Sequence, residues 1–367
     1  MKFNFSIFNY LVAIYMSVFA YENLLHYTFH IALPISVLKP MILILFFLLI
    51  FITRNIKKGL SFLESFFLIY IVLLFIFSYI YPSLGLGYSL TMFFIFGSLY
   101  LLKYIKEYLD FNKIISITLW LNIPLIVINL VLMFNSSFYT YKMQFFGTHG
   151  NPNVFGMWIL FVLVLIYLYP NRNRMRNILF TIVFIMIIAS ISRSTIVSSL
   201  FIVILYFKDN KKIIYITSAI LSIIFIYYAS DIQFIKAILN RFSGDSARDF
   251  SSMFNLIINN NFLPNGTNTF SYLMEKQGSI PDNSYLFVIS DLGFLGIIYF
   301  IPFIYVFIFS NIETKFLIFP LLFQSIFEKV LIATTSSYLF LILLIIIVFP
   351  ERLKIYKLKL ARRIICN

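Results

Sequence analysis

Twelve apolar runs, bounded by charged or turn-forming residues, constrain what this chain can fold into. A helix needs about 20 apolar residues to cross a hydrocarbon core about 30 Å thick. The runs cover residues 3–21, 31–53, 62–81, 84–105, 114–134, 153–170, 178–192, 194–207, 213–230, 285–309, 316–334 and 336–349. At this length only helices satisfy their backbone groups in lipid. The sequence therefore predicts an all-α polytopic membrane protein with about 12 transmembrane helices.

The composition excludes several other classes of protein. Hydrophobic residues make up 61% of the chain and charged residues 11%, against about 45–50% and about 25% in soluble domains. A soluble enzyme, a disordered tail and a disulfide scaffold do not fit these values. The single cysteine, Cys366, allows no intrachain disulfide. The first apolar run has no small-residue cleavage site, so we expect no cleavable signal peptide.

The positive charges predict how the helices are oriented. A net charge of +14 is the kind of value that nucleic-acid-binding proteins show. With a cytoplasmic N-terminus, however, 20 of the 28 Lys and Arg residues fall on the cytoplasmic side. They cluster in residues 54–58, 103–113, 172–176, 208–212, 311–315 and 351–367. We therefore expect both termini in the cytoplasm and no nucleic-acid partner.

One external loop is much longer than the others. We divide the chain into helices one to nine (residues 1–230), a large external loop (231–284), helices ten to twelve (285–349) and a basic cytoplasmic tail (350–367). Loops longer than about 15 residues are usually functional or disordered. The external loop is therefore the first place to look for a site.

Arg193 stands between two short apolar runs, residues 178–192 and 194–207. A charge at membrane depth costs several kcal/mol unless it is paired or hydrated. Arg193 is either a snorkelling or helix-capping residue at the outer interface, or a residue that binds an anion. The second interpretation is possible because a guanidinium group binds two phosphate oxygens at once, in a bidentate contact. Runs this short reach only about 22 Å as helix. The pair must tilt, extend into its flanks, or hold Arg193 in a wet recess.

The large loop holds further candidates. Arg241 and Arg248 are seven residues apart and would share one face of a helix; the alternative is a solvated helix with local Arg–Asp pairs. Asp282 and Asn283 lie where the chain returns to the membrane. They form either a helix N-cap or, for Asp282, a general base at the mouth of an external cavity.

A third cluster, residues 146–153, contains His149, Asn151 and Asn153 at the start of an external span. A simple turn would explain it as well as substrate binding does. His26 and His30 have metal-binding spacing but no third ligand nearby, so we expect no metal site and no cofactor. The chain has no phosphate-binding Gly-x-x-x-x-Gly-Lys and no Asp-x-Asp of metal-dependent sugar-nucleotide transferases, which leaves ATP-driven transport and nucleotide-sugar chemistry without support.

Four motifs, in this order, resemble the O-antigen polymerase and ligase superfamily of bacterial polysaccharide assembly. They are residues 150–156 (Gly-Asn-Pro-Asn-Val-Phe-Gly), 192–194 (Ser-Arg-Ser), 241–242 (Arg-Phe) and 282–296, which begins Asp-Asn-Ser-Tyr-Leu. The resemblance covers roughly residues 145–305. The N-terminal third is similar only in having hydrophobic spans.

The resemblance implies a glycosyltransferase of the GT-C kind in the bacterial cytoplasmic (inner) membrane. Such enzymes use undecaprenyl-diphosphate-linked oligosaccharides at the outer face, with a chain-length regulator and a flippase as partners besides membrane lipid. It also implies that Arg193 and Arg241, with Arg248, hold the diphosphate. The ligase branch has His where this chain has Asp282, which favours a polymerase. A ligase and a lipid-linked oligosaccharide flippase or transporter stay as alternatives.

Overall fold

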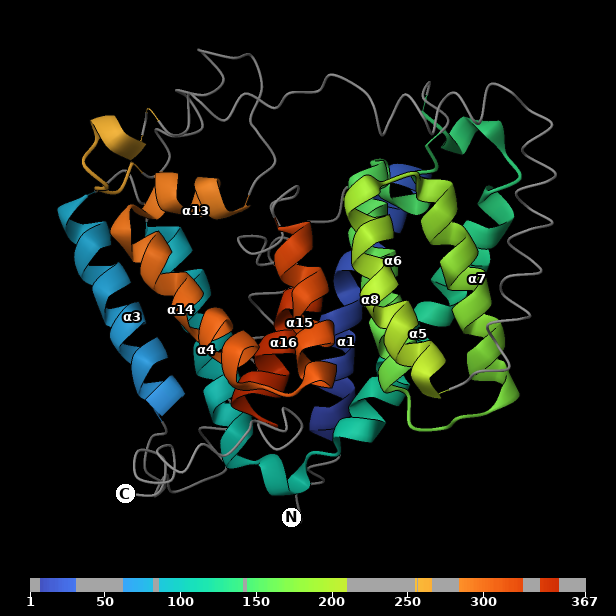
Figure 1. Ribbon diagram of the computed structural model, residues 1–367, viewed down its shortest axis with the longest axis horizontal. Coiled ribbons are helices and arrows are strands. Elements are labelled where there is room, and N and C mark those ends of the chain that lie inside the picture. The colour runs from blue at the N-terminus through green and yellow to red at the C-terminus, as the bar shows by residue number, and fades with distance from the viewer. Residues whose placement is uncertain are drawn as a thin grey trace. The chain divides into compact units, whose positions relative to one another are not determined.

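The structure is a computed structural model, and Figure 1 shows that its regular elements are helices. It describes residues 7–30, 62–81, 86–140, 144–209, 255, 257–265, 284–325 and 337–349. Within these ranges the chain forms no strand, only an isolated bridge between Tyr139 and Phe145. The predicted all-α class is confirmed. The predicted spans 31–53 and 213–230 lie outside the described residues, as do the basic tail and most of the large loop.

The chain forms two compact units, and each draws on two separate stretches of sequence. The first unit comprises Met1–Ile35 and Leu109–Ser246, and the second comprises Ser36–Tyr108 and Ala247–Asn367. The first contains α1 (Ile7–Asn23), the π-helix η1 (Leu24–Thr28), α5 (Phe111–Leu132), η4 (Ser136–Phe138), η5 (Gly147–His149), α6 (Pro152–Leu168), α7 (Arg174–Ser190) and α8 (Arg193–Asp209). The second contains α3 (Phe62–Ile80), α4 (Leu86–Tyr104), η3 (Lys106–Tyr108), α13 (Ser284–Leu292), α14 (Phe294–Phe309), α15 (Ile312–Gln324) and α16 (Ser337–Ile347).

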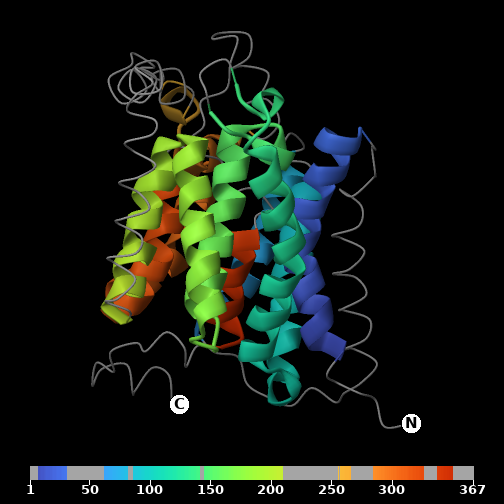
Figure 2. The same ribbon diagram turned by 90° about the vertical axis from the view of Figure 1, so that its right-hand side faces the viewer.

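Helix α6 is the centre of the first unit. It packs against α5, α7 and α8, and its apolar side chains from Ile159 to Ile166 are buried all round. A helix with no polar face needs neighbours on every side. Helix α1 runs along α5 in the same direction, since the Asp110 N–H donates to Asn9 Oδ1 at one end and Asn122 Nδ2 to Ser17 Oγ further along. Figure 2 shows these helices side by side.

The short apolar pair predicted around Arg193 forms two helices longer than the runs themselves. Helices α7 and α8 have 17 residues each, which corresponds to about 26 Å. Both helices extend into their polar flanks, one of the three outcomes expected for this pair. Helix α7 begins at the N-cap Asn173, whose side chain accepts from the Arg176 N–H, and ends at Ile191 in the left-handed region.

The prediction of a single span over residues 285–309 is wrong. The run is broken at Gly293, which has φ +59°, and α13 lies crosswise to α14 in Figure 1. A side chain at Gly293 would collide with the carbonyl oxygen of Phe262, and the Phe294 N–H donates to that same oxygen at 2.8 Å. Asn265 Nδ2 also donates to the Ser290 carbonyl at 3.1 Å. Residues 262–265, the part of the large loop that the structure describes next to α13, therefore dock onto the break.

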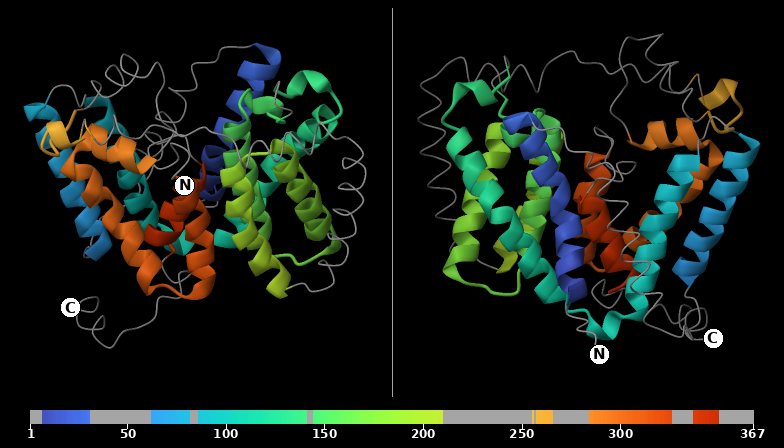
Figure 3. Two further views of the ribbon diagram at one scale, coloured as in Figure 1. Left: turned by 45° about the horizontal axis from the view of Figure 1, so that its top comes forward. Right: turned by 180° about the vertical axis from the view of Figure 1, so that it is seen from behind.

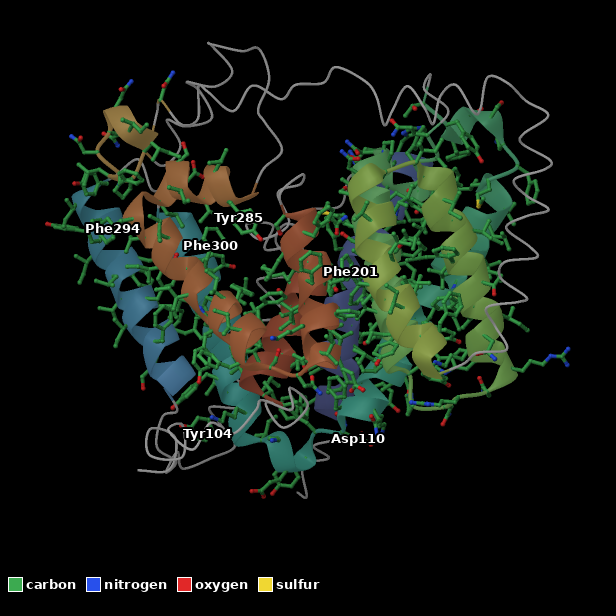
Figure 4. The ribbon with its side chains drawn as sticks, in the orientation of Figure 1. Tyr104, Asp110, Phe201, Tyr285, Phe294 and Phe300 are labelled. Carbon is green, nitrogen blue, oxygen red and sulfur yellow. The ribbon has the colours of Figure 1, made fainter. Side chains whose placement is uncertain are left out.

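Side chains of the second unit hold α13 from its other end. The Tyr285 hydroxyl donates to the Leu322 carbonyl of α15 at 2.7 Å, and the rings of Tyr285 and Phe300 are 5.0 Å apart (Figure 4). Together with the contact at Gly293, this fixes the direction in which the chain enters α14.

Among the described helices, α5 is the one that is both long and apolar enough to cross a membrane by length and composition. Shorter apolar stretches of 10–17 residues lie in five further helices. They are Ser65–Ile80, Pro152–Leu168, Ser194–Phe207, Phe294–Phe309 and Ser337–Ile347.

Candidate functional site

Two of the predicted motifs meet in the first unit, where α6 and α8 begin. Helices α6, α7 and α8 alternate in direction through short turns, so α6 and α8 run parallel and start at the same end. A Cβ at Gly156 would overlap Thr195 Oγ1 and would lie 3.4 Å from the Ser192 Cβ. The motif at residues 150–156 and the motif at 192–194 are therefore in direct contact. We call this end of the first unit the α6/α8 end.

The start of α6 is built by three consecutive residues. Gly150 has φ +65°, which suits glycine. Asn151 is the N-cap, and its Oδ1 accepts from the Asn153 N–H at 2.8 Å. Pro152 occupies the first turn, where its missing N–H costs nothing. Asn151 is exposed, and its Nδ2 takes no part in this cap.

The start of α8 is surrounded by buried hydroxyl groups. The Thr195 hydroxyl donates to Ser192 Oγ at 3.0 Å, and the Ser192 N–H donates to Ser190 Oγ at 3.3 Å. Ile191 just before has φ 47°, a strained conformation for a β-branched residue. Such strain persists where the surroundings fix the backbone. The Phe145 N–H contributes by donating to the Ala189 carbonyl at 3.1 Å.

Asn129 of α5 holds the turn that leads into α6. Its Oδ1 accepts from the Thr148 N–H at 2.9 Å, and its Nδ2 donates to Thr148 Oγ1 at 3.1 Å and to the Leu125 carbonyl at 2.8 Å. Both Asn129 and Thr148 are fully buried. Gly147 lies so close that a Cβ there would overlap Asn129 Oδ1. A buried amide with this many partners fixes the position of the turn.

Asn122, two helical turns before Asn129, joins three helices. It donates from Nδ2 to Ser17 Oγ of α1 at 3.1 Å and accepts at Oδ1 from Trp158 Nε1 of α6 at 2.9 Å. The Trp158 ring in turn stacks on His149, with centroids 4.9 Å apart. The two asparagines are thus linked through Trp158, His149 and Thr148. We call this set of buried side chains the buried polar chain; it ends at the turn that leads into α6.

His149, predicted to bind substrate, is fully buried in the structure. Its ring packs against Trp158 and Phe155, and its Nδ1 lies 3.1 Å from Thr148 Oγ1. Burial lowers the pKa of the imidazole to about 3, because the charged form loses its hydration. His149 is therefore neutral at pH 7.

The other predicted site residues divide into two groups. Asn151, Asn153 and the backbone of Arg193 lie at the α6/α8 end, on the first turns of the two parallel helices. Arg241, Arg248, Asp282 and Asn283 lie outside the described residues. The predicted diphosphate clamp and base therefore stay predictions.

The sequence analysis missed the buried polar chain. Ser17, Asn122 and Asn129 lie inside predicted apolar spans, where the apolar count alone hides them. The available signal was the spacing of Asn122 and Asn129, since residues seven apart lie on one face of a helix. Arg176 was expected in a cytoplasmic loop, with the other charges of residues 172–176. The structure buries it, with Nε donating to the Ile166 carbonyl at 2.8 Å and its guanidinium 4.7 Å from the Tyr206 ring.

The α6/α8 end can attract an anion. The first N–H groups of a helix have no intrahelical acceptor, and the helix dipole makes the N-terminus positive. Two N-termini that start side by side add their effects. Within the described residues no group of three His, Cys, Asp or Glu side chains could hold a metal ion.

No protein family, curated protein sequence or solved structure gives a significant match to this chain.

Proposed function

We propose that the chain is a polytopic membrane enzyme, a polysaccharide polymerase for O-antigen or capsule. It would transfer a glycan from undecaprenyl diphosphate onto a lipid-linked repeat unit at the outer face of the cytoplasmic membrane. The observation that carries the proposal is the contact of the two motifs at the α6/α8 end. Residues 150–156 and 192–194 are far apart in sequence, yet a Cβ at Gly156 would lie 3.4 Å from the Ser192 Cβ.

Exposed apolar stripes support the membrane part of the proposal. On α14, Ile297, Ile301, Ile304 and Ile308 are each about half exposed at spacings of three and four residues. On α3, Ile69, Val72 and Ile76 repeat this pattern. Such spacing puts each set on one face of its helix. Soluble monomers rarely expose continuous apolar faces of this kind, whereas lipid covers them at no cost.

The chemistry needs a positive environment for a leaving diphosphate. The acceptor hydroxyl oxygen forms a bond to the anomeric carbon, and the bond from that carbon to the diphosphate oxygen breaks with its electron pair. Cationic groups that bind the departing charge lower this barrier. Arg193 at the start of α8 and Arg241 would take this role, with Arg248 beside them and no metal ion. Asp282 would accept the proton of the acceptor hydroxyl, so that the configuration at the anomeric carbon inverts.

The N-termini of α6 and α8 would add to this environment. A diphosphate near Arg193 would face the positive N-terminal end of α8 and lie beside the first turn of α6. Asn151 and Asn153, with amides at the same end, would bind sugar hydroxyls.

The test is the pattern of surface polysaccharide in cells that carry Arg193→Ala, Arg241→Ala or Asp282→Ala. A polymerase defect leaves single repeat units at the surface, whereas a flippase defect removes surface material altogether. A ligase defect leaves full-length polymer on its lipid carrier. Full-length surface polymer from the arginine variants at normal expression would exclude the diphosphate clamp. Arg174→Ala, an exposed arginine at the opposite end of α7, is the matched control.

A further inference from the structure

The junction between η1 and η5 holds three buried polar atoms that lack hydrogen-bond partners. They are Asn23 Nδ2, Thr28 Oγ1 and His149 Nε2. Asn23 precedes the π-helix, Thr28 ends it, and His149 ends η5. The two short helices pack against each other at the α6/α8 end (Figure 3). Burying such an atom without a partner is unfavourable, so three at one junction point to a group that would bind there.

The hydrogen bonds around His149 determine what its free nitrogen offers. Thr148 Oγ1 already accepts from Asn129 Nδ2, and its own proton finds an acceptor in His149 Nδ1. We assign the tautomer from this bond: with Nδ1 as the acceptor, the neutral ring carries its proton on Nε2. His149 Nε2 and Asn23 Nδ2 are both donors, and the Thr28 hydroxyl donates or accepts. A group that satisfies all three side chains therefore contains an oxygen that accepts two hydrogen bonds.

Charge favours a neutral oxygen. Asn23 and Thr28 carry no charge, and burial keeps His149 neutral. An anionic oxygen bound by these three side chains would be desolvated without a counter-charge from them, which is expensive. A hydroxyl oxygen, in water or in a sugar, meets the requirement, because it accepts two hydrogen bonds and donates one.

The surface above the junction suits a sugar. Tyr27 lies flat against Gly150, where any Cβ would overlap three atoms of its ring. Tyr27 is 46% exposed, and Asn151, which follows Gly150 in the chain, is also exposed. An aromatic ring beside a few placed polar groups is the usual make-up of a ligand site. π-Helical turns also occur frequently at functional sites.

We propose that the η1–η5 junction binds one sugar unit of the lipid-linked glycan, through a hydroxyl held by Asn23, Thr28 and His149 and a ring face covered by Tyr27. This inference rests on the proposed function for its ligand, and it places the sugar on the first unit beside the first turn of α6.

The chain offers a probe that needs no enzymatic activity. It has two tryptophans; Trp120 is exposed on α5, and Trp158 stacks on His149. In a Trp120→Phe variant of the full chain, Trp158 emission reports on the junction. The purified variant is titrated with the methyl glycosides of glucose, galactose and N-acetylglucosamine, and separately with inorganic pyrophosphate.

We expect at least one glycoside to change Trp158 emission in a saturable way, while pyrophosphate does not. Asn23→Leu and the near-isosteric Thr28→Val each weaken that glycoside about 10-fold or more, the effect of one lost hydrogen bond to a buried site. Asn135→Ala, an exposed amide at the same end, leaves its affinity unchanged. Tyr27→Ala removes the stacking face and also weakens binding.

No response to any glycoside, with Asn23→Leu folded and its polymer unchanged, would overturn the inference and leave the junction as a site for water only. A response to pyrophosphate in place of the glycosides would also overturn it. Saturable glycoside binding by a protein that makes no polymer would instead contradict the proposed function and leave the junction as a sugar site.

Discussion

The side chain of Asn129 accepts a 2.9 Å hydrogen bond from the backbone N–H of Thr148, and both residues are fully buried. This contact joins the last turn of the apolar helix α5 to the turn that carries Asn151 and the start of α6. It explains why a turn at the end of the unit has a defined backbone. Four predictions on the first unit follow from it and its neighbours, and a fifth concerns the reaction.

Asn129→Leu should destabilise the protein by about 1–3 kcal/mol, because it leaves the buried Thr148 N–H without a hydrogen-bond acceptor. Asn135→Ala, which removes an exposed cap on η4, should cost less than about 1 kcal/mol. Thermal unfolding of the purified variants in detergent measures both. Equal stabilities for the two variants would mean that the Asn129 amide does not hold the turn.

Gly156→Ala should separate the first turns of α6 and α8, since the added methyl group meets Thr195 Oγ1. We expect a loss of about 1–3 kcal/mol from overpacking. Thr195→Ala removes the obstructing hydroxyl and methyl groups, so the double variant should recover a large part of that loss. A double-mutant cycle on unfolding gives the coupling. Additive effects would show that the two residues are not in contact.

Arg176→Met should destabilise the first unit more than Arg174→Met. Arg176 donates to the carbonyls of Ile166 and Tyr167, both at 2.8 Å, near the end of α6 and lies over the Tyr206 ring, whereas Arg174 is exposed. Arg176→Lys keeps the charge but loses the planar fork. We therefore expect it to recover only part of the stability, which chemical or thermal unfolding measures. Full recovery with lysine would show that charge alone matters.

His149 should make the stability depend on pH on the acid side. Its pKa is about 3 in the folded protein because of burial, against about 6.5 in the unfolded chain. Between these values the unfolded chain binds a proton that the folded protein excludes, so stability is full above about pH 6.5 and falls as the pH drops.

His149→Phe should reduce that loss between pH 7.5 and pH 5, while His26→Asn, at an exposed histidine, should keep it. Thermal unfolding at the two pH values compares the three proteins. The same pH dependence in His149→Phe as in the unaltered chain would show that His149 is not the group responsible.

The all-α class was predictable because long apolar runs form little else than helices. Among the runs that the structure describes, most form helices within a few residues of their expected ends. The break at Gly293 was not predictable from the sequence, because it depends on a contact with the Phe262 carbonyl, which lies in the large loop. In the candidate site, the sequence motifs marked Asn151 and Arg193 but not the contact between Gly156 and Thr195. Asn122 and Asn129 stayed hidden because their partners come from other helices, and hydrophobic patterns carry no information on such pairs.

Reconstitution of the purified chain in liposomes with a synthetic undecaprenyl-diphosphate-linked repeat unit tests the proposed activity most directly. The unaltered protein should produce lipid-linked dimers and longer oligomers with release of undecaprenyl diphosphate, without ATP or a nucleotide sugar. Arg193→Ala should stop elongation, and Arg174→Ala should not. Movement of the unaltered repeat unit across the liposome membrane, with no oligomer formed, would contradict the account and identify a transporter.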